Sequence, residues 1–333
     1  MRLQDLLWAL FQKTKHDSKA RYWLASNRMP TPMPSVAADI KRRENAVVEE
    51  AEPEYSLSRL FCIGGLAGTF ETLIQQPLVY WKTMSQVNPN FSIGAAVKAG
   101  FRPLFRGVGV NAGSIGPISA VQLAAHGGLE IGAKQVAPEH IDKPIFQLAL
   151  ASLSGIASCV VVTPAEVLMV TQQTTGRQFA GVFKDIMAKG GISTLFRGNA
   201  PTAFREAAWT CGFFGITPIL KKALQDDSKF CRRNDVAATV ISCVISGQFA
   251  ATVSQPADVI ASLMKADNGV YGVKKYTGVL ETCGALYKES GAGGFFRGLS
   301  ARSWRCVGAV FIMGEAQTAL HSWFDSFGLM NKR

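Results

Sequence analysis

Hydrophobic residues gather in six long segments that are separated by shorter polar stretches. The segments span residues 57–86, 109–133, 145–174, 200–223, 236–266 and 300–324. At 1.5 Å per residue, each is long enough as a helix to cross the roughly 30 Å hydrocarbon core of a bilayer. None is uniformly apolar, since each carries Gly, Ser, Thr, Gln or a charged residue. Because polar groups inside a membrane span normally face a cavity or a partner, the pattern predicts helices that line a solvated pathway.

A short motif recurs three times along the chain. Each copy has a proline late in an apolar segment and, after a loop, a Phe-Arg-Gly triplet; the prolines are Pro77, Pro164 and Pro256, and the triplets begin at Phe105, Phe196 and Phe296. Successive prolines are 87 and 92 residues apart, and successive triplets are 91 and 100 apart. This spacing indicates one unit of roughly 90 residues used three times. Each unit is predicted to form a helix kinked at its proline, a loop and a second helix.

Small residues open the apolar segment that precedes each proline, at 64–68, 152–155 and 246–250. Small side chains let helix backbones approach closely in lipid, where no hydrophobic force drives helices together. The pattern therefore predicts close helix packing at these positions.

With these motifs the sequence resembles the mitochondrial carrier family. The family signature is Pro, any residue, an acid, two residues and a base, and later Gly, four residues, an aromatic, a base and Gly. The resemblance covers about residues 54 to 326. It implies an all-α, multi-pass protein of the mitochondrial inner membrane, with six transmembrane helices in three pseudo-threefold repeats and short amphipathic matrix helices. The expected repeats are 54–140, 141–233 and 234–333, after an N-terminal extension of residues 1–53.

The loop of each repeat carries a short amphipathic stretch, at 93–99, 179–188 and 276–288, which is predicted to lie in the interface plane. The glycine that opens the next helix offers free backbone N–H groups that suit a lipid phosphate. Family members bind cardiolipin here, and no other cofactor is expected. The matching residues are Gly100, Phe105, Arg106, Gly107, Gly191, Phe196, Arg197, Gly198, Gly291, Phe296, Arg297 and Gly298. The alternative is that the three arginines only reach toward headgroups.

In the family, the acid and the base of each signature form a ring of salt bridges that closes the matrix side of the pathway. Here the ring positions hold Val79, Lys82, Glu166, Met169, Asp258 and Ala261. The family's pairing predicts a Lys82–Asp258 bridge and an apolar contact between Val79 and Met169. It leaves Glu166 opposite Ala261, without a charged partner.

Three polar residues lie four positions beyond the positions where the family signature has its bases. Gln86 and Gln173 match the family's bracing glutamines, and Lys265 takes the third position. Because Lys265 is one helical turn past Ala261, it could replace the lost bridge by pairing with Glu166. The usual cytoplasmic ring has no acid–base pair of its normal pattern at the matching positions, 126–130, 217–221 and 317–321.

Between the two rings, the family's substrate-contact positions hold Ser114, Arg205, Glu206 and Arg305, and Arg302 adds positive charge on the same helix face as Arg305. Arginines in a cavity bind a carboxylate or a phosphate through two parallel hydrogen bonds. In the family, an arginine followed by an acid at this point goes with amino-acid-like substrates. The alternative is structural, with Arg205 and Glu206 pairing with neighbouring helices.

The net charge of +11 raises the question of nucleic-acid binding. The basic residues are dispersed, in short runs such as 41–43 and 232–233, whereas a nucleic-acid footprint would be clustered. An anionic membrane surface is therefore the favoured partner. The seven cysteines show no paired spacing and the four histidines no ligand spacing, so no metal site or disulfide framework is predicted.

Residues 1–53 stand outside the repeats. The first eleven have apolar side chains at helical spacing with Lys13 and Lys15 behind them, as in an import presequence or an interfacial helix. Residues 30–53 combine Pro30, Pro32 and Pro34 with an acidic end and are predicted to form an extended polar tether.

Two functions of different class follow from these observations. The first is a solute carrier for a small carboxylated metabolite, with an amino acid as a candidate. The second is a transport-inactive subunit of a larger inner-membrane complex, respiratory or ATP synthase, held to its partners through residues 1–53. The contact-site arginines favour the carrier, and the incomplete rings favour the subunit. No catalytic residues are predicted, because no catalytic motif is present.

Overall fold

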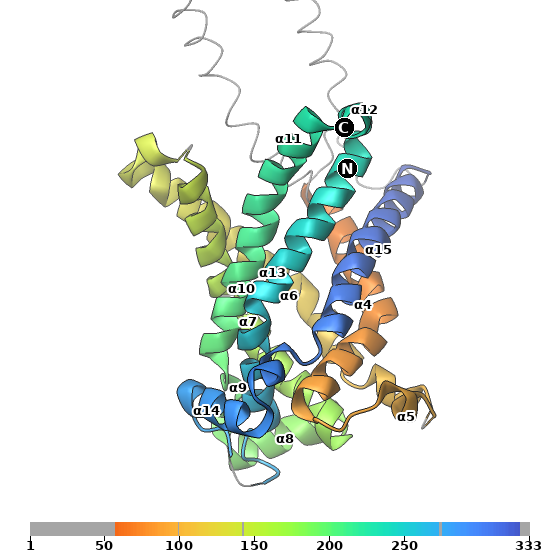
Figure 1. Cartoon of the computed structure of the whole chain (residues 1–333), viewed down its shortest axis with the longest axis vertical. Helices are drawn as coiled ribbons and strands as arrows, with labels where there is room; N and C mark the ends of the chain where they lie inside the picture. The colour runs from red at the N-terminus through yellow and green to blue at the C-terminus, as the bar shows by residue number, and fades with distance from the viewer. Residues whose placement is uncertain (1–56, 99, 142, 273–274, 327–333) are drawn as a thin grey trace, which may run out of the picture. The chain divides into compact units, whose positions relative to one another are not determined.

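The computed structural model (Figure 1) describes residues 57–98, 100–141, 143–272 and 275–326, so the N-terminal extension lies outside the described residues. Six long helical runs make up most of this part: α4 (Leu57–Val87), α6 (Val108–Val136), α7 (Pro144–Thr175), α10 continued by a π-helical turn and α11 (Asn199–Cys211, Gly212–Ile216, Thr217–Asp227), α13 (Asp235–Ala266) and α15 (Leu299–Ser326). Each predicted segment coincides with one of these runs to within four residues at either end.

Short helices join the long ones. The three amphipathic pieces are α5 (Ile93–Lys98), α8 (Phe179–Lys189) and α14 (Val279–Ser290), and they gather at one end of the long helices (Figure 1). The third begins three residues later than predicted, because Gly278 is still extended at φ −129° and ψ 169°. The remaining short elements are η1 (Arg102–Phe105), η2 (Pro138–His140), α9 (Gly191–Leu195), α12 (Lys229–Arg233) and η4 (Ala292–Phe296).

The described residues form two compact units, of which the larger, here called the main unit, is Gly68–Met313. The smaller contains residues 57–67 and 314–326. Its rings of Trp323 and Phe324 meet edge to face with their centroids 5.5 Å apart. The site described below lies within the main unit.

The helices of the main unit contact one another in a closed sequence. Polar contacts join each to the next: Asn111 to Gln76 (2.9 Å) between α6 and α4, Gln122 to Ser158 (3.3 Å) between α6 and α7, Thr163 to Asn199 (2.7 Å) between α7 and α10, and Gln248 to the Ser303 carbonyl (3.0 Å) between α13 and α15. Thr217 and Ser246 (2.5 Å) join α11 to α13. Gly308 of α15 lies against Gln75 of α4, which closes the ring.

Small residues bring neighbouring helices close, as predicted. A Cβ atom on Gly155 of α7 would lie 2.9 Å from the Glu206 carbonyl oxygen of α10. A Cβ atom on Gly212 would lie 2.6 Å from the Cβ of Ala250 on α13. Only glycine fits at these two positions without displacing a neighbour.

The three glycines of the triplets make equivalent contacts around the ring. A Cβ atom on each would meet the base position of the next repeat: Gly107 meets Met169 Cγ at 2.8 Å, Gly198 meets the Ala261 carbonyl oxygen at 3.2 Å, and Gly298 meets the Lys82 carbonyl oxygen at 2.9 Å. All three have positive φ, of +79°, +74° and +73°. Glycine is therefore required both by backbone conformation and by space, and the cyclic order of the contacts shows the threefold pseudosymmetry of the main unit.

Pro77, Pro164 and Pro256 lie inside α4, α7 and α13, which continue on both sides of them. The residue before each proline is buried and ties its helix to the second half of the same repeat. Gln76 donates to the Arg106 carbonyl (2.9 Å), Gln255 to the Arg297 carbonyl (2.7 Å), and Thr163 to Asn199. The kink expected at each proline stays a prediction.

The loop after α13 docks onto the second repeat. Val270 is buried in a cluster with Val167, Leu168, Val182 and Ile186 of α7 and α8. Buried Asn268 donates to Thr171 Oγ1 at 2.8 Å, and the Tyr271 hydroxyl donates to Asp185 at 2.9 Å. Burial, together with this hydrogen bond, raises the pKa of Tyr271. A loop of the third repeat therefore contributes a residue to the hydrophobic cluster of the second repeat.

Candidate functional site

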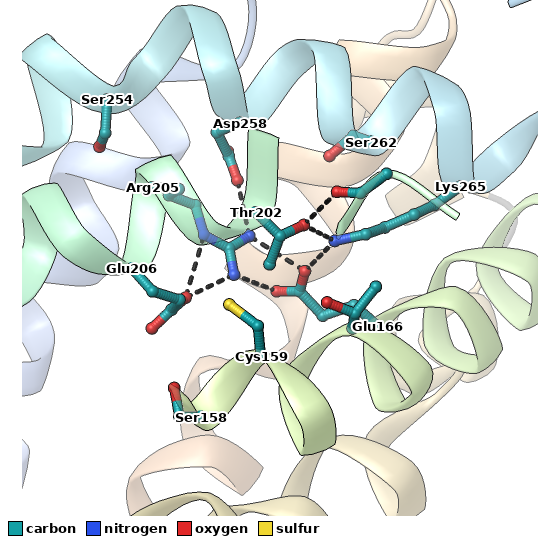
Figure 2. A network of polar contacts seen from close by, with 12 residues as sticks. Ser158, Cys159, Glu166, Thr202, Arg205, Glu206, Ser254, Asp258, Ser262 and Lys265 are labelled. Carbon is teal, nitrogen blue, oxygen red and sulfur yellow. Dashed lines mark hydrogen bonds and ion pairs between the residues drawn. The ribbon is translucent and has the colours of Figure 1, made fainter. Parts of the chain in front are cut away.

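Seven charged side chains converge in the interior of the main unit. Figure 2 shows those of Glu166, Arg205, Glu206, Asp258 and Lys265. This group, here called the ion-pair network, consists of Lys82 from α4, Glu166 from α7, Arg205 and Glu206 from α10, Asp258 and Lys265 from α13, and Arg302 from α15. It holds four cations and three anions. Buried charges are tolerated when they are paired and hydrogen-bonded, so the contacts of each member decide whether it is free to meet a solute.

The predicted contact between Lys82 and Asp258 is present. Lys82 Nζ lies 2.9 Å from Asp258 Oδ1 and 2.8 Å from Oδ2, although Asp258 is fully buried. Gln86 donates to Asp258 Oδ2 at 2.7 Å and accepts a hydrogen bond from Ser262 at 2.7 Å. Gln86 therefore braces this bridge, as its position predicted.

The contact between Glu166 and Lys265 is also present. Lys265 Nζ donates to Glu166 Oε2, and it donates to Thr202 Oγ1 at 2.6 Å. Lys265 is 1% exposed, among the most buried side chains of the described chain. Ala261 at the base position is thus compensated by a lysine one turn along the same helix.

Arg205 contacts the acids of both bridges. The sequence had predicted that it lies at an open substrate-contact position. Its Nη1 lies 3.0 Å from both Glu166 Oε2 and Asp258 Oδ1, and its Nη2 lies 2.6 Å from Glu206 and 2.9 Å from Glu166 Oε1. Nε donates to Glu206 at 3.1 Å. Figure 2 shows the guanidinium between these carboxylates. All three nitrogens are engaged because three acids from three helices meet here. Arg205 therefore pairs with neighbouring helices, as in the structural alternative, whereas Glu206 pairs with Arg205 of its own helix.

Arg302 is likewise engaged within the protein rather than open to a solute. Its Nη2 donates to Ser254 at 2.8 Å, its Nη1 donates to Gln255 at 3.2 Å, and Nη1 lies 3.7 Å from Asp258 Oδ2. Asp258 is therefore surrounded by three cations from three different helices.

The third predicted ring contact is apolar. Val79 and Met169 are buried in one cluster with Val170, which matches the expectation for these positions. Gln173 has no ion pair to brace there, and it donates instead to the Arg106 carbonyl at 3.3 Å. Gln173 matches the family's bracing position, but the contact beside it is hydrophobic, as the sequence predicted for Val79 and Met169.

The other two predicted substrate-contact residues, Ser114 and Arg305, are not members of the ion-pair network. Ser114 donates to the Asn111 carbonyl of its own helix at 2.8 Å. Arg305 is partly exposed and makes no hydrogen bond or ion pair with the residues that the structure describes. Arg305 is therefore the central arginine with donors to spare.

The arginines of the triplets are used in different ways. Arg197 donates through Nε to the Met264 carbonyl at 2.8 Å and through Nη2 to the Tyr276 carbonyl, so it closes the C-terminal end of α13, where cations are favourable. Arg297 donates to Ser290. The guanidinium of Arg106 lies against Gly176 and makes no hydrogen bond within the described chain.

The predicted lipid set also contains glycines and phenylalanines. Gly100, Gly191 and Gly291 have positive φ of 107°, 68° and 60°, and all three triplet phenylalanines are exposed. A cavity of about 280 Å³ is lined by Ser193, Thr194, Arg197, Gly198, Met264 and Thr277. It lies beside Gly198, the residue that precedes α10, at the N-terminal end of that helix, where the helix dipole favours an anion.

Comparison with known proteins places the chain in a family. A family model described as "Mitochondrial carrier protein" matches residues 142–228 and 232–324. The chain is 25% identical over 274 residues to the mitochondrial 2-oxodicarboxylate carrier 1 of Saccharomyces cerevisiae, covering 74% of this chain and 86% of that protein. It is 26% identical over 294 residues to a probable mitochondrial phosphate carrier protein of Schizosaccharomyces pombe, covering 81% and 90%.

A third relative is the mitochondrial adenine nucleotide transporter ADNT1 of Arabidopsis thaliana, 25% identical over 328 residues, with 82% of this chain and 93% of that protein covered. In the described chain, Ile145–Thr175 and Asp235–Ala266 carry stretches apolar enough to span a membrane, with mean hydropathy of 2.1 and 1.7. The matched family model covers more than half of the chain, and the helices and motifs agree with it. The chain belongs to the mitochondrial carrier family, and it is a multi-pass, all-α protein of the mitochondrial inner membrane.

Proposed function

We propose that this protein is a solute carrier that moves a small carboxylated metabolite across the inner membrane. The observation that carries the proposal is Arg305, a partly exposed arginine on a membrane helix with no partner among the described residues. An unpaired charge inside a membrane protein normally marks a ligand pathway. A guanidinium binds a carboxylate through two parallel hydrogen bonds. Two of the relatives are named for anionic solutes, 2-oxodicarboxylates and phosphate, which supports this class.

The ion-pair network serves in this proposal as the closed matrix-side gate. It ties together α4, α7, α10, α13 and α15 through contacts between residues far apart in sequence. Such contacts can be exchanged for others when the helices separate, as alternating access requires. The alternative, a transport-inactive subunit, was suggested by the missing bases of the matrix-side ring. The network compensates for the missing bases through Lys265 and Arg205, so the carrier is the function we favour.

Uptake by reconstituted liposomes tests the proposal. Wild type should take up at least one labelled compound from a panel of 2-oxo acids, dicarboxylates and amino acids, and Arg305→Ala should lower its affinity about 10- to 100-fold, the effect of losing one charge-assisted contact. Arg177→Ala is the matched control, because Arg177 forms an exposed ion pair with Asp185. No uptake across the panel, together with stable co-purification of other inner-membrane subunits, would favour the alternative.

Cardiolipin is the lipid we propose for the positions around the triplets. It should raise the melting temperature in detergent, because a ligand that binds only the folded state stabilises it, by about 2.7 kcal/mol at 100 times Kd. Arg106→Ala should reduce this rise more than Arg197→Ala, since the Arg197 guanidinium is already held by two carbonyl oxygens. An unchanged rise in the variant lacking Arg106, Arg197 and Arg297 would show that these arginines only reach toward headgroups.

A further inference from the structure

A buried acid lies outside the ion-pair network, on α4. Glu71 is 6% exposed, and its hydrogen bonds come from two neutral side chains of the same helix: Gln75 Nε2 at 2.6 Å and Thr72 Oγ1 at 3.3 Å. No ion pair with Glu71 is present in the described part of the chain, whereas Glu166, Glu206 and Asp258 all contact Arg205. Glu71 therefore lacks the cation that each network carboxylate has.

The side-chain amide of Gln75, next to Glu71, also lacks a partner. Gln75 is 2% exposed, and its Oε1 is buried without a hydrogen-bond partner among the described residues. A buried acceptor without a donor costs free energy, and here the orphaned oxygen lies next to a carboxylate. Gln75 Oε1 needs a hydrogen-bond donor, and the Glu71 carboxylate, whose two oxygens already accept hydrogen bonds, lacks a positive charge nearby. A cation that donates hydrogen bonds would satisfy both groups.

The opposite helix places this pair relative to Arg305. Gly308 of α15 faces Gln75, since a Cβ atom there would lie 3.2 Å from Gln75 Oε1, and Gly298 faces Lys82. The residue numbers run in opposite directions, so α4 and α15 are antiparallel. Arg305 lies three residues before Gly308 and Glu71 four residues before Gln75, which separates the two backbones by roughly 10 Å along the axes. An arginine and a glutamate side chain can span this distance with a small solute between them.

We propose that Glu71 and Gln75 form an ammonium subsite, which receives the amino group of a zwitterionic substrate whose carboxylate binds Arg305. This rests on the proposed function and specifies its substrate class as amino acids. An ammonium group has three N–H donors and a positive charge, which matches a carboxylate and an orphaned amide oxygen. Glu206 follows Arg205 in the family pattern that goes with amino-acid-like substrates, but Glu206 is engaged by Arg205.

The test compares each amino acid with the 2-oxo acid of the same carbon skeleton in liposomes. Glu71→Gln keeps the size of the side chain and removes its charge. We expect it to lower uptake of the amino acid at least about 10-fold, as kcat/KM, while uptake of the 2-oxo acid changes less than about twofold. Glu289→Gln is the matched control, because Glu289 forms an exposed ion pair with Lys275, away from both rings and from Arg305.

The outcomes of these experiments separate the possibilities. Selective loss of amino-acid uptake supports the subsite. Wild-type uptake of 2-oxo acids alone, or equal loss of both substrates in Glu71→Gln, overturns it and leaves the carrier proposal standing. No uptake by wild type overturns both. If Glu71→Gln does not fold, Gln75→Met removes the orphaned acceptor at similar volume, and an unchanged preference between the two substrates in that variant also overturns the subsite.

Discussion

Asp258→Asn is expected to lower the stability of the purified protein by about 3–5 kcal/mol, the usual cost of removing one partner from a buried ion pair. The side chain is fully buried and faces Lys82, Arg205 and Arg302. Asparagine keeps the shape of aspartate but leaves these three cations without their common anion. In detergent the melting temperature should fall on the order of 5–10 °C.

A double-mutant cycle with Lys82→Met identifies the source of the loss. Lys82→Met alone should cost less than Asp258→Asn, since Asp258 keeps Arg205 and Arg302 as partners. The double variant should cost less than the sum of the two single losses, because removing Lys82 also removes one of the uncompensated cations. Asp185→Asn is the control: its bridge to exposed Arg177 should be worth less than about 1 kcal/mol. Additive losses for Lys82 and Asp258 would contradict the pairing.

The repeats made part of this site predictable from sequence. A shared register placed Lys82 opposite Asp258 and Val79 opposite Met169, and helix geometry allowed Lys265 to reach Glu166. These contacts depend on position within the repeat, which is visible in the sequence. The long helices were predictable for a similar reason, since a span must be continuously helical to satisfy its backbone groups in lipid.

The role of Arg205 was not predictable in the same way. Whether an arginine at a contact position faces a solute or a neighbouring acid depends on how close three helices come, which the repeat pattern does not specify. One signal was present in the sequence. The ring position opposite Glu166 holds Ala261 instead of a base, so another cation was expected to pair with Glu166. Glu71 also had a signal, since an acid within an apolar span is costly unless it is paired or functional.

The only sequence feature that indicated the loop after α13 was the spacing of the Phe-Arg-Gly triplets. The last two triplets are 100 residues apart and the first two 91, so the third repeat carries extra residues. Nothing in their sequence says that Val270 enters a cluster of the second repeat. That contact arises from tertiary packing between segments about 100 residues apart.

Arg205→Leu is expected to loosen the gate and expose the thiol of Cys159. This cysteine is 3% exposed, and Figure 2 shows it beside the Arg205–Glu206 pair. Without Arg205, Glu166 keeps Lys265 and Asp258 keeps Lys82, but Glu206 loses its cation. An unpaired acid favours a state in which water reaches it, so a hydrophilic maleimide should modify Cys159 about 10- to 100-fold faster, as read by mass spectrometry.

Cys243 supplies an internal control for that experiment. It is 1% exposed on α13 and is not a member of the ion-pair network. If Arg205 holds the gate, only Cys159 should react faster, because opening at the network leaves the packing around Cys243 intact. Faster reaction of both thiols would indicate general loosening of the bundle instead. An unchanged rate at Cys159 would show that Lys82–Asp258 and Glu166–Lys265 close the matrix side without Arg205, which would then act only as the partner of Glu206.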